Sequence, residues 1–241
     1  ATFMLNILQK TYPNALSIHI QHKNIAYPRI VIKNNLSMYV RVPLHFSHTR
    51  LLDFVMNNHL WIESTLHKLK NNRINLQTCL ENHNNQILIF GKWYKLHQIH
   101  TLSPQALNLS PNTLDSIPKT SSLQARLKAL LFAYIGIKVD SQAMLMGLEY
   151  RSVKITQALS RFGSCSGKNR LCFSFMLIFA KQTLIDYVII HELAHIVHKN
   201  HSKAFWNLVI QYCPDAKILR ENLRQEARIY PALLQYLKEL E

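Results

Sequence analysis

The chain has 241 residues, of which 48% are hydrophobic, and its formal net charge is +15. This composition excludes an intrinsically disordered protein, and the length suffices for one large domain or two small ones. The longest apolar runs are too short to cross a bilayer, and the first residues do not resemble a signal peptide, so we expect a cytoplasmic protein with no membrane partner. Four cysteines without a C-x-x-C pair suit reduced thiols in that compartment.

The first hundred residues are predicted to form a β-rich N-terminal region with one helix. Alternating apolar or β-branched residues predict strands at 15–21, 29–33 and 38–42. The segment that follows, 49–69, is predicted to be helical. The turn-forming residues 82–85 then precede a strand pair that reverses through Gly91, so the region ends in a hairpin.

Residues 101–120 differ in composition from the segments on either side. They contain the pairs Ser103-Pro104, Ser110-Pro111 and Ile117-Pro118. Proline removes a backbone donor and disfavours the helical conformation of the residue before it, so three such pairs indicate a linker or an irregular crossing. We place the domain boundary there.

The second domain, residues 121–241, is predicted to open with a helix at about 122–136 that continues or breaks before Ser141. The later elements are expected to be strands at 152–159 and 170–175, a long apolar helix ending near residue 200, and helices at 203–212 and 215–228. This order of elements fits an α+β fold, in which a strand beside the apolar helix can hold an extended peptide by main-chain pairing.

Residues 191–201 read His-Glu-Leu-Ala-His-Ile-Val-His-Lys-Asn-His. On a helix His191 and His195 lie one turn apart, about 6 Å along the axis, so both imidazoles can face one ion. Neutral imidazole binds Zn²⁺ at about 2.0–2.1 Å, and a catalytic zinc site keeps one position open for water. Glu192 directly follows His191 and is the natural general base for that water. The motif therefore predicts zinc-dependent hydrolysis.

The helix that carries this motif is predicted to be buried. Thr183 with Asp186 resembles a capping box, and residues 184–197 are apolar almost all round apart from the motif itself. Burying Glu192 among apolar residues is unfavourable unless a partner compensates. A metal ion would provide that compensation, so the pattern and the motif support the same prediction.

The third ligand has several candidates. His198 lies roughly 7 Å along the helix from the level midway between the first two histidines, so we expect it to support a ligand or lie at the surface. Asn200 tolerates the left-handed conformation that ends many helices, and a turn there could return His201 to the metal. The H-E-x-x-H motif and His201 have the spacing of the pattern H-E-x-x-H-x-x-G-x-x-H, although His198 stands in the place of its turning glycine. The other option is a downstream carboxylate, Glu221 or Glu226.

Several motifs in the second domain occur together. They are Arg-Phe-Gly-Ser-Cys-Ser at 161–166, the run from Asp186 to His195, Asn-His-Ser at 200–202, Phe205-Trp206 and Cys213-Pro214-Asp215. This set resembles the YgjP-like metallopeptidases, small bacterial proteins related to the WLM and SprT-like groups. The resemblance covers residues 121–225 strongly and the N-terminal half loosely. It implies a zincin-like fold, with His191, His195 and His201 as zinc ligands and Glu192 as catalytic acid/base.

Two positions depart from the family pattern. Phe162 replaces the usual Trp of the R-W-G-S-C-S motif, and Ser174 stands near the place where the family commonly has Asn. Neither residue belongs to the metal set. We therefore expect these departures to affect the contact of that strand with substrate, and not the binding of the metal.

Positive charge is spread over the whole chain. Residues 1–120 contain 12 Lys and Arg against 4 Asp and Glu, and residues 121–241 contain 16 against 9. One stripe of a predicted helix holds Lys217, Arg220, Arg224 and Arg228. Such a stripe attracts nucleic acid without reading its sequence. A solvated basic face explains it equally well, because Glu221 and Glu226 partly offset the charge.

Two functions from different classes follow from these features. The first is a zinc metallopeptidase, in which Glu192 assists the attack of a zinc-bound water on a peptide bond of a peptide or protein substrate. The second is a nucleic-acid-associated protein with a mainly structural zinc site, or a protease that acts only on DNA-bound proteins, as the related SprT-like and WLM proteins suggest. The candidates for oxyanion stabilisation or ligand support are Arg161, His198 and Tyr230. The sequence indicates neither the substrate nor the oligomeric state.

Overall fold

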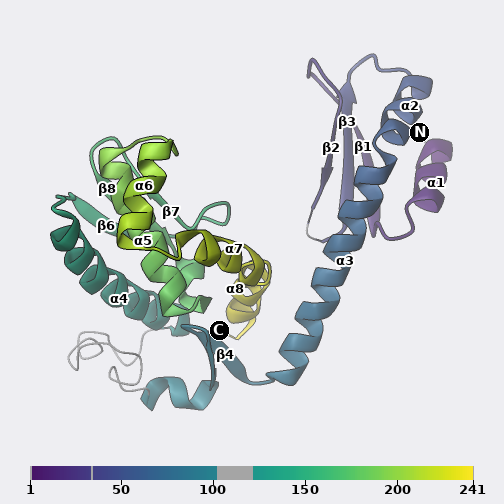
Figure 1. Ribbon diagram of the computed structural model, residues 1–241. Coiled ribbons are helices and arrows are strands. Elements are labelled where there is room, and N and C mark those ends of the chain that lie inside the picture. The colour runs from purple at the N-terminus through teal and green to yellow at the C-terminus, as the bar shows by residue number, and fades with distance from the viewer. Residues whose placement is uncertain (1, 34, 102–121, 241) are drawn as a thin grey trace. The chain divides into compact units, whose positions relative to one another are not determined.

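The computed structural model describes residues 2–33, 35–101 and 122–240. The chain divides into two compact units, Ala1–Asn82 and His83–Glu241 (Figure 1). The predicted linker at 101–120 lies outside the described residues, except for residue 101.

The division between the units falls earlier than the boundary expected after residue 100. A hairpin of β4 (Gln86–Ile89) and β5 (Lys92–Lys95) accounts for this difference, because it packs within the second unit. The backbone N–H of Phe90 in its turn donates to the carbonyl of Ile178, at 2.8 Å. Both turn residues, Phe90 and Gly91, have positive φ (49° and 78°), as the tightest hairpin turns require.

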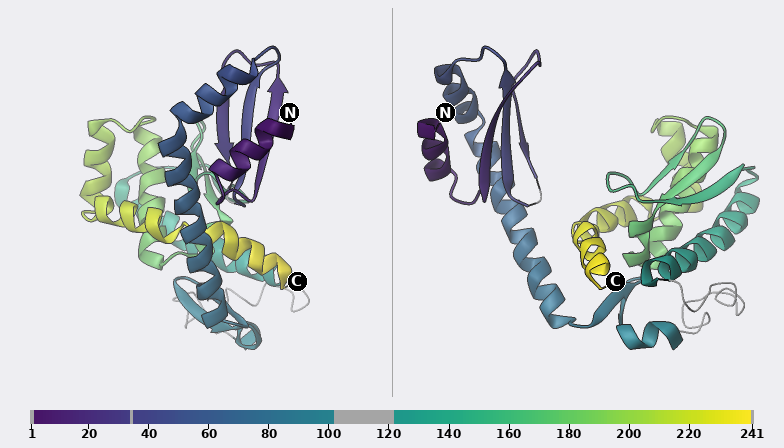
Figure 2. Two further views of the ribbon diagram at one scale, coloured as in Figure 1. Left: turned by 90° about the vertical axis from the view of Figure 1, so that its right-hand side faces the viewer. Right: turned by 180° about the vertical axis from the view of Figure 1, so that it is seen from behind.

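The first unit combines three helices with a three-stranded sheet. Its elements are α1 (Thr2–Thr11), β1 (Ser17–Lys23), β2 (Arg29–Ile32), β3 (Ser37–Pro43), α2 (His48–Asn57) and α3 (His59–Asn82). Strand β3 lies in the centre, parallel to β1 and antiparallel to β2. The helices lie against one face of the sheet (Figure 2).

Buried and half-buried residues alternate along β3, so the two faces of the sheet differ in burial. Met38, Val40 and Val42 are 0% exposed and pack in one core with apolar residues of the three helices. Tyr39 and Arg41 alternate with them and are only half-buried, because successive side chains of a strand point to opposite faces. The face away from the helices is therefore polar.

The described residues of the N-terminal region form three α-helices where one helix was predicted. The predicted helix at 49–69 crosses a break at Asn58, whose backbone N–H donates to the carbonyl of Val55 and closes α2. Helix α1 was missed, although Met4 and Leu8 form its buried face and Tyr12, directly after the helix, continues the four-residue spacing.

The second unit begins with the hairpin and continues with helices around a second sheet. Its further elements are the 3₁₀ helix η1 (Leu96–Thr101), α4 (Leu123–Met146), β6 (Ser152–Thr156), β7 (Gly163–Cys165), β8 (Arg170–Ser174), the 3₁₀ helix η4 (Phe175–Phe179), α5 (Gln182–Val197), α6 (Lys203–Tyr212), α7 (Ala216–Glu226) and α8 (Tyr230–Glu239). Helix α8 was not predicted. The chain is a mixed helix-and-sheet protein, consistent with the expected α+β class.

Helix α4 is one continuous helix, without the break that was considered before Ser141. The Ser122 hydroxyl caps its first turn by accepting from the Ala125 N–H, and Gly147, with φ 65°, ends it in the left-handed conformation. By length and composition alone α4 could span a membrane. Leu127, Leu131 and Ile135 are 0% exposed within the unit, as in the core helix of a globular domain.

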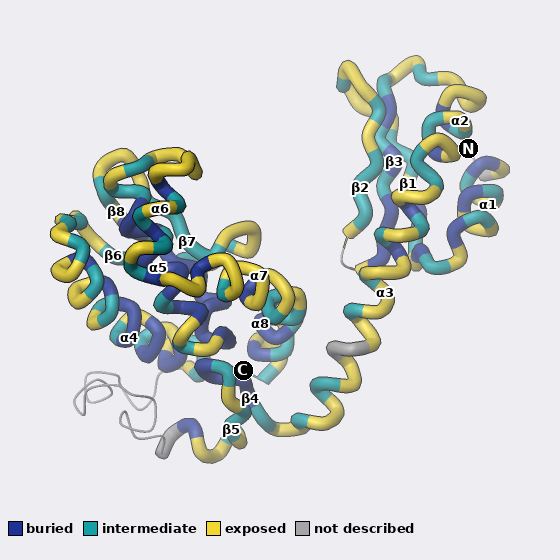
Figure 3. Tube along the Cα trace, in the orientation of Figure 1, coloured by how far each residue is buried: buried dark blue, intermediate teal, exposed yellow. Residues whose placement is uncertain are grey.

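The second sheet and helix α5 contribute many of the buried residues of the second unit (Figure 3). Strand β8 lies between β6, to which it is parallel, and β7, to which it is antiparallel. All five residues of η4 are buried directly after β8 and lead the chain into α5, which packs against β7 and α4. This arrangement sets one helix, α5, beside the edge strand β7.

Candidate metal centre

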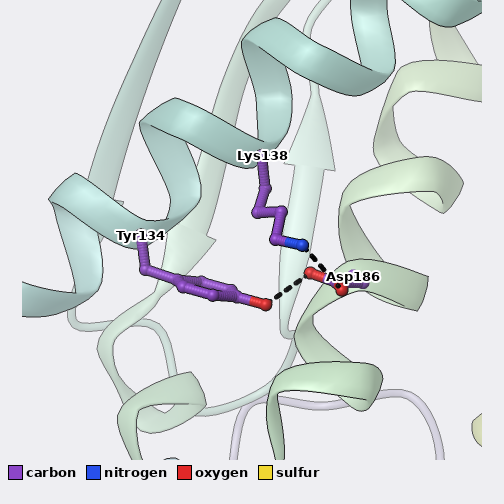
Figure 4. Close-up of polar contacts among 3 residues, drawn as sticks. All are labelled: Tyr134, Lys138 and Asp186. Atoms are coloured by element: carbon purple, nitrogen blue, oxygen red, sulfur yellow. Dashed lines mark hydrogen bonds and ion pairs between the residues drawn. The ribbon is translucent and has the colours of Figure 1, made fainter. Parts of the chain in front are cut away.

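Helix α5 is held in place by its apolar surface and by polar contacts of Asp186 with α4. The predicted capping box is not formed, because Thr183 lies inside the helix and the N-cap, Lys181, makes no side-chain hydrogen bond to it. Asp186 instead accepts a hydrogen bond from the hydroxyl of Tyr134 at 2.7 Å and lies 3.5 Å from the ammonium of Lys138 (Figure 4). These contacts tie α5 to α4 on one side of the helix.

Three histidines come together at the C-terminal end of α5. The ring nitrogens that His191, His195 and His201 can offer lie within 4.8 Å of one another, and Nε2 of His191 is 3.0 Å from Nε2 of His201. Helix α5 ends at Val197, earlier than the expected end near Asn200, because His198 adopts an extended conformation (φ −118°, ψ 103°). This early end lets the chain turn back and bring His201 to the other two rings.

The donor set fits a metal ion such as zinc. Tetrahedral zinc with nitrogen ligands at about 2.0–2.1 Å places those nitrogens about 3.3 Å apart, so the observed cluster is close to the required size. Nδ1 of His195 lies 2.9 Å from the carbonyl of His198, and donation there leaves Nε2 free to bind a metal. Burial, together with the neighbouring His195 ring, lowers the pKa of His191 to about 3, so this ring is neutral as a ligand must be.

The alternative ligands have other contacts. Glu226 accepts a charged hydrogen bond from Lys181 at 2.7 Å, and Glu221 lies 3.7 Å from Arg224. His198 contributes its backbone carbonyl, which orients His195. Within the described ranges, the group able to hold a metal contains only the three histidines.

Glu192 has the environment of a proton acceptor. It is only 5% exposed, and burial raises the pKa of its carboxyl to about 8, although the positive charge of Arg161 opposes that rise. Its Oε2 is buried and has no hydrogen-bond partner in the described part of the chain. A carboxyl with a raised pKa and a free oxygen is suited to take up and release a proton near neutral pH.

Gly163 lies so close to Glu192 that it limits the space for the carboxyl side chain. It was not identified as a site residue from the sequence. A Cβ atom built on Gly163 would lie 2.6 Å from both Cγ and Oε1 of Glu192. Only glycine allows β7 to approach the carboxylate this closely. The signal was present in the motif Arg-Phe-Gly-Ser-Cys-Ser, where this is the only glycine.

Phe205 and Trp206 support the histidine cluster from α6. The ring of Phe205 stacks on His195 with centroids 4.5 Å apart, and it lies 4.9 Å from both His191 and His201. Phe205 is 0% exposed, as expected for a core residue beneath the site. Trp206 lies 5.8 Å from His191 and 6.1 Å from His201, so aromatic packing restricts the orientation of the rings.

A cavity of about 840 Å³ opens beside the cluster. It is lined by the three histidines and Glu192, by residues 160–165 before and within β7, and by side chains of α5 and α7. Arg161 lines it, whereas Tyr230 does not, because its ring is 1% exposed and packs against Phe179. Two members of the predicted nucleic-acid stripe, Arg220 and Arg224, also line the cavity.

Comparison with known families adds to this geometry. A family model described as YgjP-like, metallopeptidase domain, matches residues 26–226. The chain belongs to this family. This confirms the resemblance carried by the motifs, and it indicates a metallopeptidase-type hydrolase with a metal cofactor. The match begins inside the first unit, so the YgjP-like region includes parts of both units. No curated protein and no solved structure matches the chain significantly.

Proposed function

We propose that this YgjP-like protein is a zinc-dependent peptidase with a zincin-like catalytic unit. The observation that carries the proposal is the cluster of His191, His195 and His201 next to the buried carboxyl of Glu192. The described residues offer three protein ligands, whereas a structural zinc site is normally closed by four. This number of ligands supports catalysis over a mainly structural role.

In the proposed reaction His191, His195 and His201 hold the zinc ion. Zinc bound there would lower the pKa of a water molecule to about 7 and polarise the peptide carbonyl. Glu192 accepts the proton of the attacking water at its free Oε2 and delivers it to the departing amine. The carbonyl of His198 keeps the His195 ring oriented, and Arg161 is the lining residue best suited to steady the developing oxyanion.

Strand β7 provides a means of holding an extended peptide. Among the described strands it pairs with β8 alone, at the edge of their sheet. Gly163, Ser164 and Cys165 of this strand line the cavity. An extended substrate can therefore add to this edge by main-chain hydrogen bonds, which bind a peptide without requiring a particular side chain.

The decisive test is metal analysis of the purified protein together with the ligand variants. We expect about one zinc per chain, reduced to trace levels by His201→Ala, since removing one of three ligands leaves too few. His198→Ala should keep the zinc, because its contribution is a backbone carbonyl. A wild-type protein without bound zinc, or a His201→Ala variant that retains it fully, would contradict the proposed site.

A second candidate function, association with nucleic acid, is favoured by the open face of the first sheet. Strands β1, β2 and β3 contain no acidic residue. On this face the His19 ring stacks on Tyr39 with centroids 4.7 Å apart, and the ammonium of Lys33 lies 4.5 Å from the Tyr39 ring. Arg29 and Arg41 are register partners, and like charges directly opposite each other are unfavourable unless an anion lies between them.

This candidate assigns the nucleic-acid contact to the sheet and not to the helix stripe predicted from the sequence. Single-stranded oligonucleotide should bind at low salt, and the double variant Arg29→Gln/Arg41→Gln should reduce the salt slope by about 0.7 for each phosphate that the variant no longer neutralises. The double variant Lys217→Gln/Arg228→Gln removes the same charge from the predicted stripe outside the cavity. Absence of binding at low salt, or weakened binding only in the second variant, would exclude the sheet as the contact.

A further inference from the structure

The cavity beside the histidine cluster is strongly cationic. Its charged lining residues are Arg161, Lys199, Arg220, Arg224 and, as the one carboxylate, Glu192. The cations come from three separate segments: the loop before β7, the turn after α5, and α7. Because these segments are distant in sequence, the fold, and not one basic run, gathers the charge around the site.

Few carboxylates neutralise these cations. Among the residues that the structure describes, Arg161, Lys199 and Arg220 form no ion pair, and Arg224 approaches Glu221 only at 3.7 Å with both side chains largely exposed. Such an exposed pair is weak and screens its arginine little. A bound divalent metal would add further positive charge, so the cavity attracts an anionic group.

The position of Arg220 is defined by its packing. Its guanidinium lies 5.2 Å from the ring centre of Trp206, and that ring lies against His191 and His201. A cation held over an aromatic ring keeps its full charge and its free donors. Lys199 is similarly held by a neutral partner, since its ammonium donates to the side-chain carbonyl of Asn169 at 3.2 Å. Both cations are thus oriented without being neutralised.

We propose that the substrate of this site carries an acidic side chain within one or two residues of the bond that is cleaved. This inference rests on the proposed peptidase function and names its substrate class. Arg161, Arg220 and Lys199 supply the donors that bind the carboxylate, while the edge of β7 holds the main chain. A neutral or basic peptide of the same length binds more weakly because these cations then have no partner.

The test compares binding of two fluorescent peptides that differ only in Glu against Gln at the positions flanking one peptide bond. Zinc-loaded Glu192→Gln protein is used, so that binding is measured without turnover. We expect the Glu peptide to bind about 3- to 10-fold more tightly at low ionic strength, since each exposed ion pair contributes about 0.2–1 kcal/mol. The ratio should fall as salt is added.

Matched variants distinguish the cavity cations from the metal ion and from the general positive charge of the surface. Arg220→Gln and Arg161→Gln should each reduce the Glu-to-Gln ratio by about half or more, whereas Lys168→Gln removes an exposed charge that does not line the cavity and should leave it unchanged. The measurement is repeated on metal-free protein. If the peptide carboxylate binds only to zinc and not to the arginines, the Glu-to-Gln binding ratio should fall to one without the metal. A ratio near one, a ratio insensitive to both arginine variants, or preference for a phosphoserine peptide alone would overturn the proposal.

The failure of this proposal can be told apart from the failure of the peptidase function. If the wild-type protein binds zinc but cleaves no peptide, the peptidase function fails, and the binding ratio still reports whether the cavity selects carboxylates. If peptides are cleaved with equal efficiency whether they carry Glu or Gln, the peptidase function stands and the substrate class is wrong.

Discussion

Helix α5 and strand β3 each place polar side chains next to the core of their unit. They differ in how far those side chains are buried. In α5 the carboxyl of Glu192 is 5% exposed among apolar neighbours, whereas Tyr39 and Arg41 of β3 alternate with buried residues and face outward. A polar group on the open face of a strand has little effect on stability, while a buried carboxyl is unfavourable without a partner. Under the proposed functions, this difference assigns the chemistry to α5 and the surface contact to β3.

Removing the carboxylate of α5 should have the largest effect on activity. Glu192→Gln keeps the shape of the side chain but cannot accept a proton, so kcat/KM for peptide hydrolysis should fall by about 10²–10⁴ while zinc content stays unchanged. Glu149→Gln alters an exposed carboxyl after α4 and serves as the control. Steady-state kinetics with a quenched peptide measures both. Wild-type activity in Glu192→Gln would show that the buried carboxyl has no catalytic role.

Metal removal should affect the unit of α5 and not the unit of β3. A ligand that binds only the folded state at 1,000 times its dissociation constant stabilises it by about 4 kcal/mol. Chelation should therefore increase amide hydrogen exchange in α5 and α6, which carry the cluster and its aromatic support. Exchange in β1 and β3, whose core contains none of the three histidines, should stay the same. Equal loosening of both units on chelation would contradict this separation.

The sequence predicted the grouping of the histidines of α5 better than the ends of that helix. The spacing of His191 and His195 already places both imidazoles on one helical face, because that depends only on helix periodicity. The end of α5 at Val197 could not be predicted, since it depends on the tertiary arrangement that brings His201 back. The capping box was wrong for the same reason: Asp186 forms its contacts with α4, far away in sequence.

The N-terminal unit shows a similar division. The strands of its sheet were predicted closely, because alternation of apolar and polar residues is a local signal. The break at Asn58 and helix α1 were missed, although the four-residue spacing of Met4 and Leu8 was a local sign of α1. The cationic cavity could not be predicted either: Arg161 and Arg220 are 59 positions apart, and only the fold brings them to one cavity.

The close approach of β7 to α5 gives a finer test of how tightly Glu192 is positioned. Gly163→Ala would place a methyl group 2.6 Å from Cγ and Oε1 of Glu192. Relieving such an overlap costs about 1–3 kcal/mol, so we expect a lower melting temperature and activity reduced by tenfold or more through displacement of the carboxyl. Gly167→Ala is the matched control, because Gly167 lines the same cavity and a Cβ there meets nothing within 4 Å. Equal effects of the two variants would mean that the contact of Gly163 is unimportant.

The smallest expected effect concerns the polar contact that ties α5 to α4. The Tyr134 ring is 3% exposed, and its hydroxyl donates to Asp186, while burial and this hydrogen bond raise the pKa of the phenol well above its ordinary value. Tyr134→Phe removes the donor, so the free energy of unfolding should fall by about 1 kcal/mol. Tyr150→Phe removes a similar hydroxyl, which donates to Asp140 at an exposed site, and should change stability by less. Urea denaturation compares the two variants. If both lose the same stability, burial does not strengthen the contact, and the anchoring of α5 must come from its apolar surface alone.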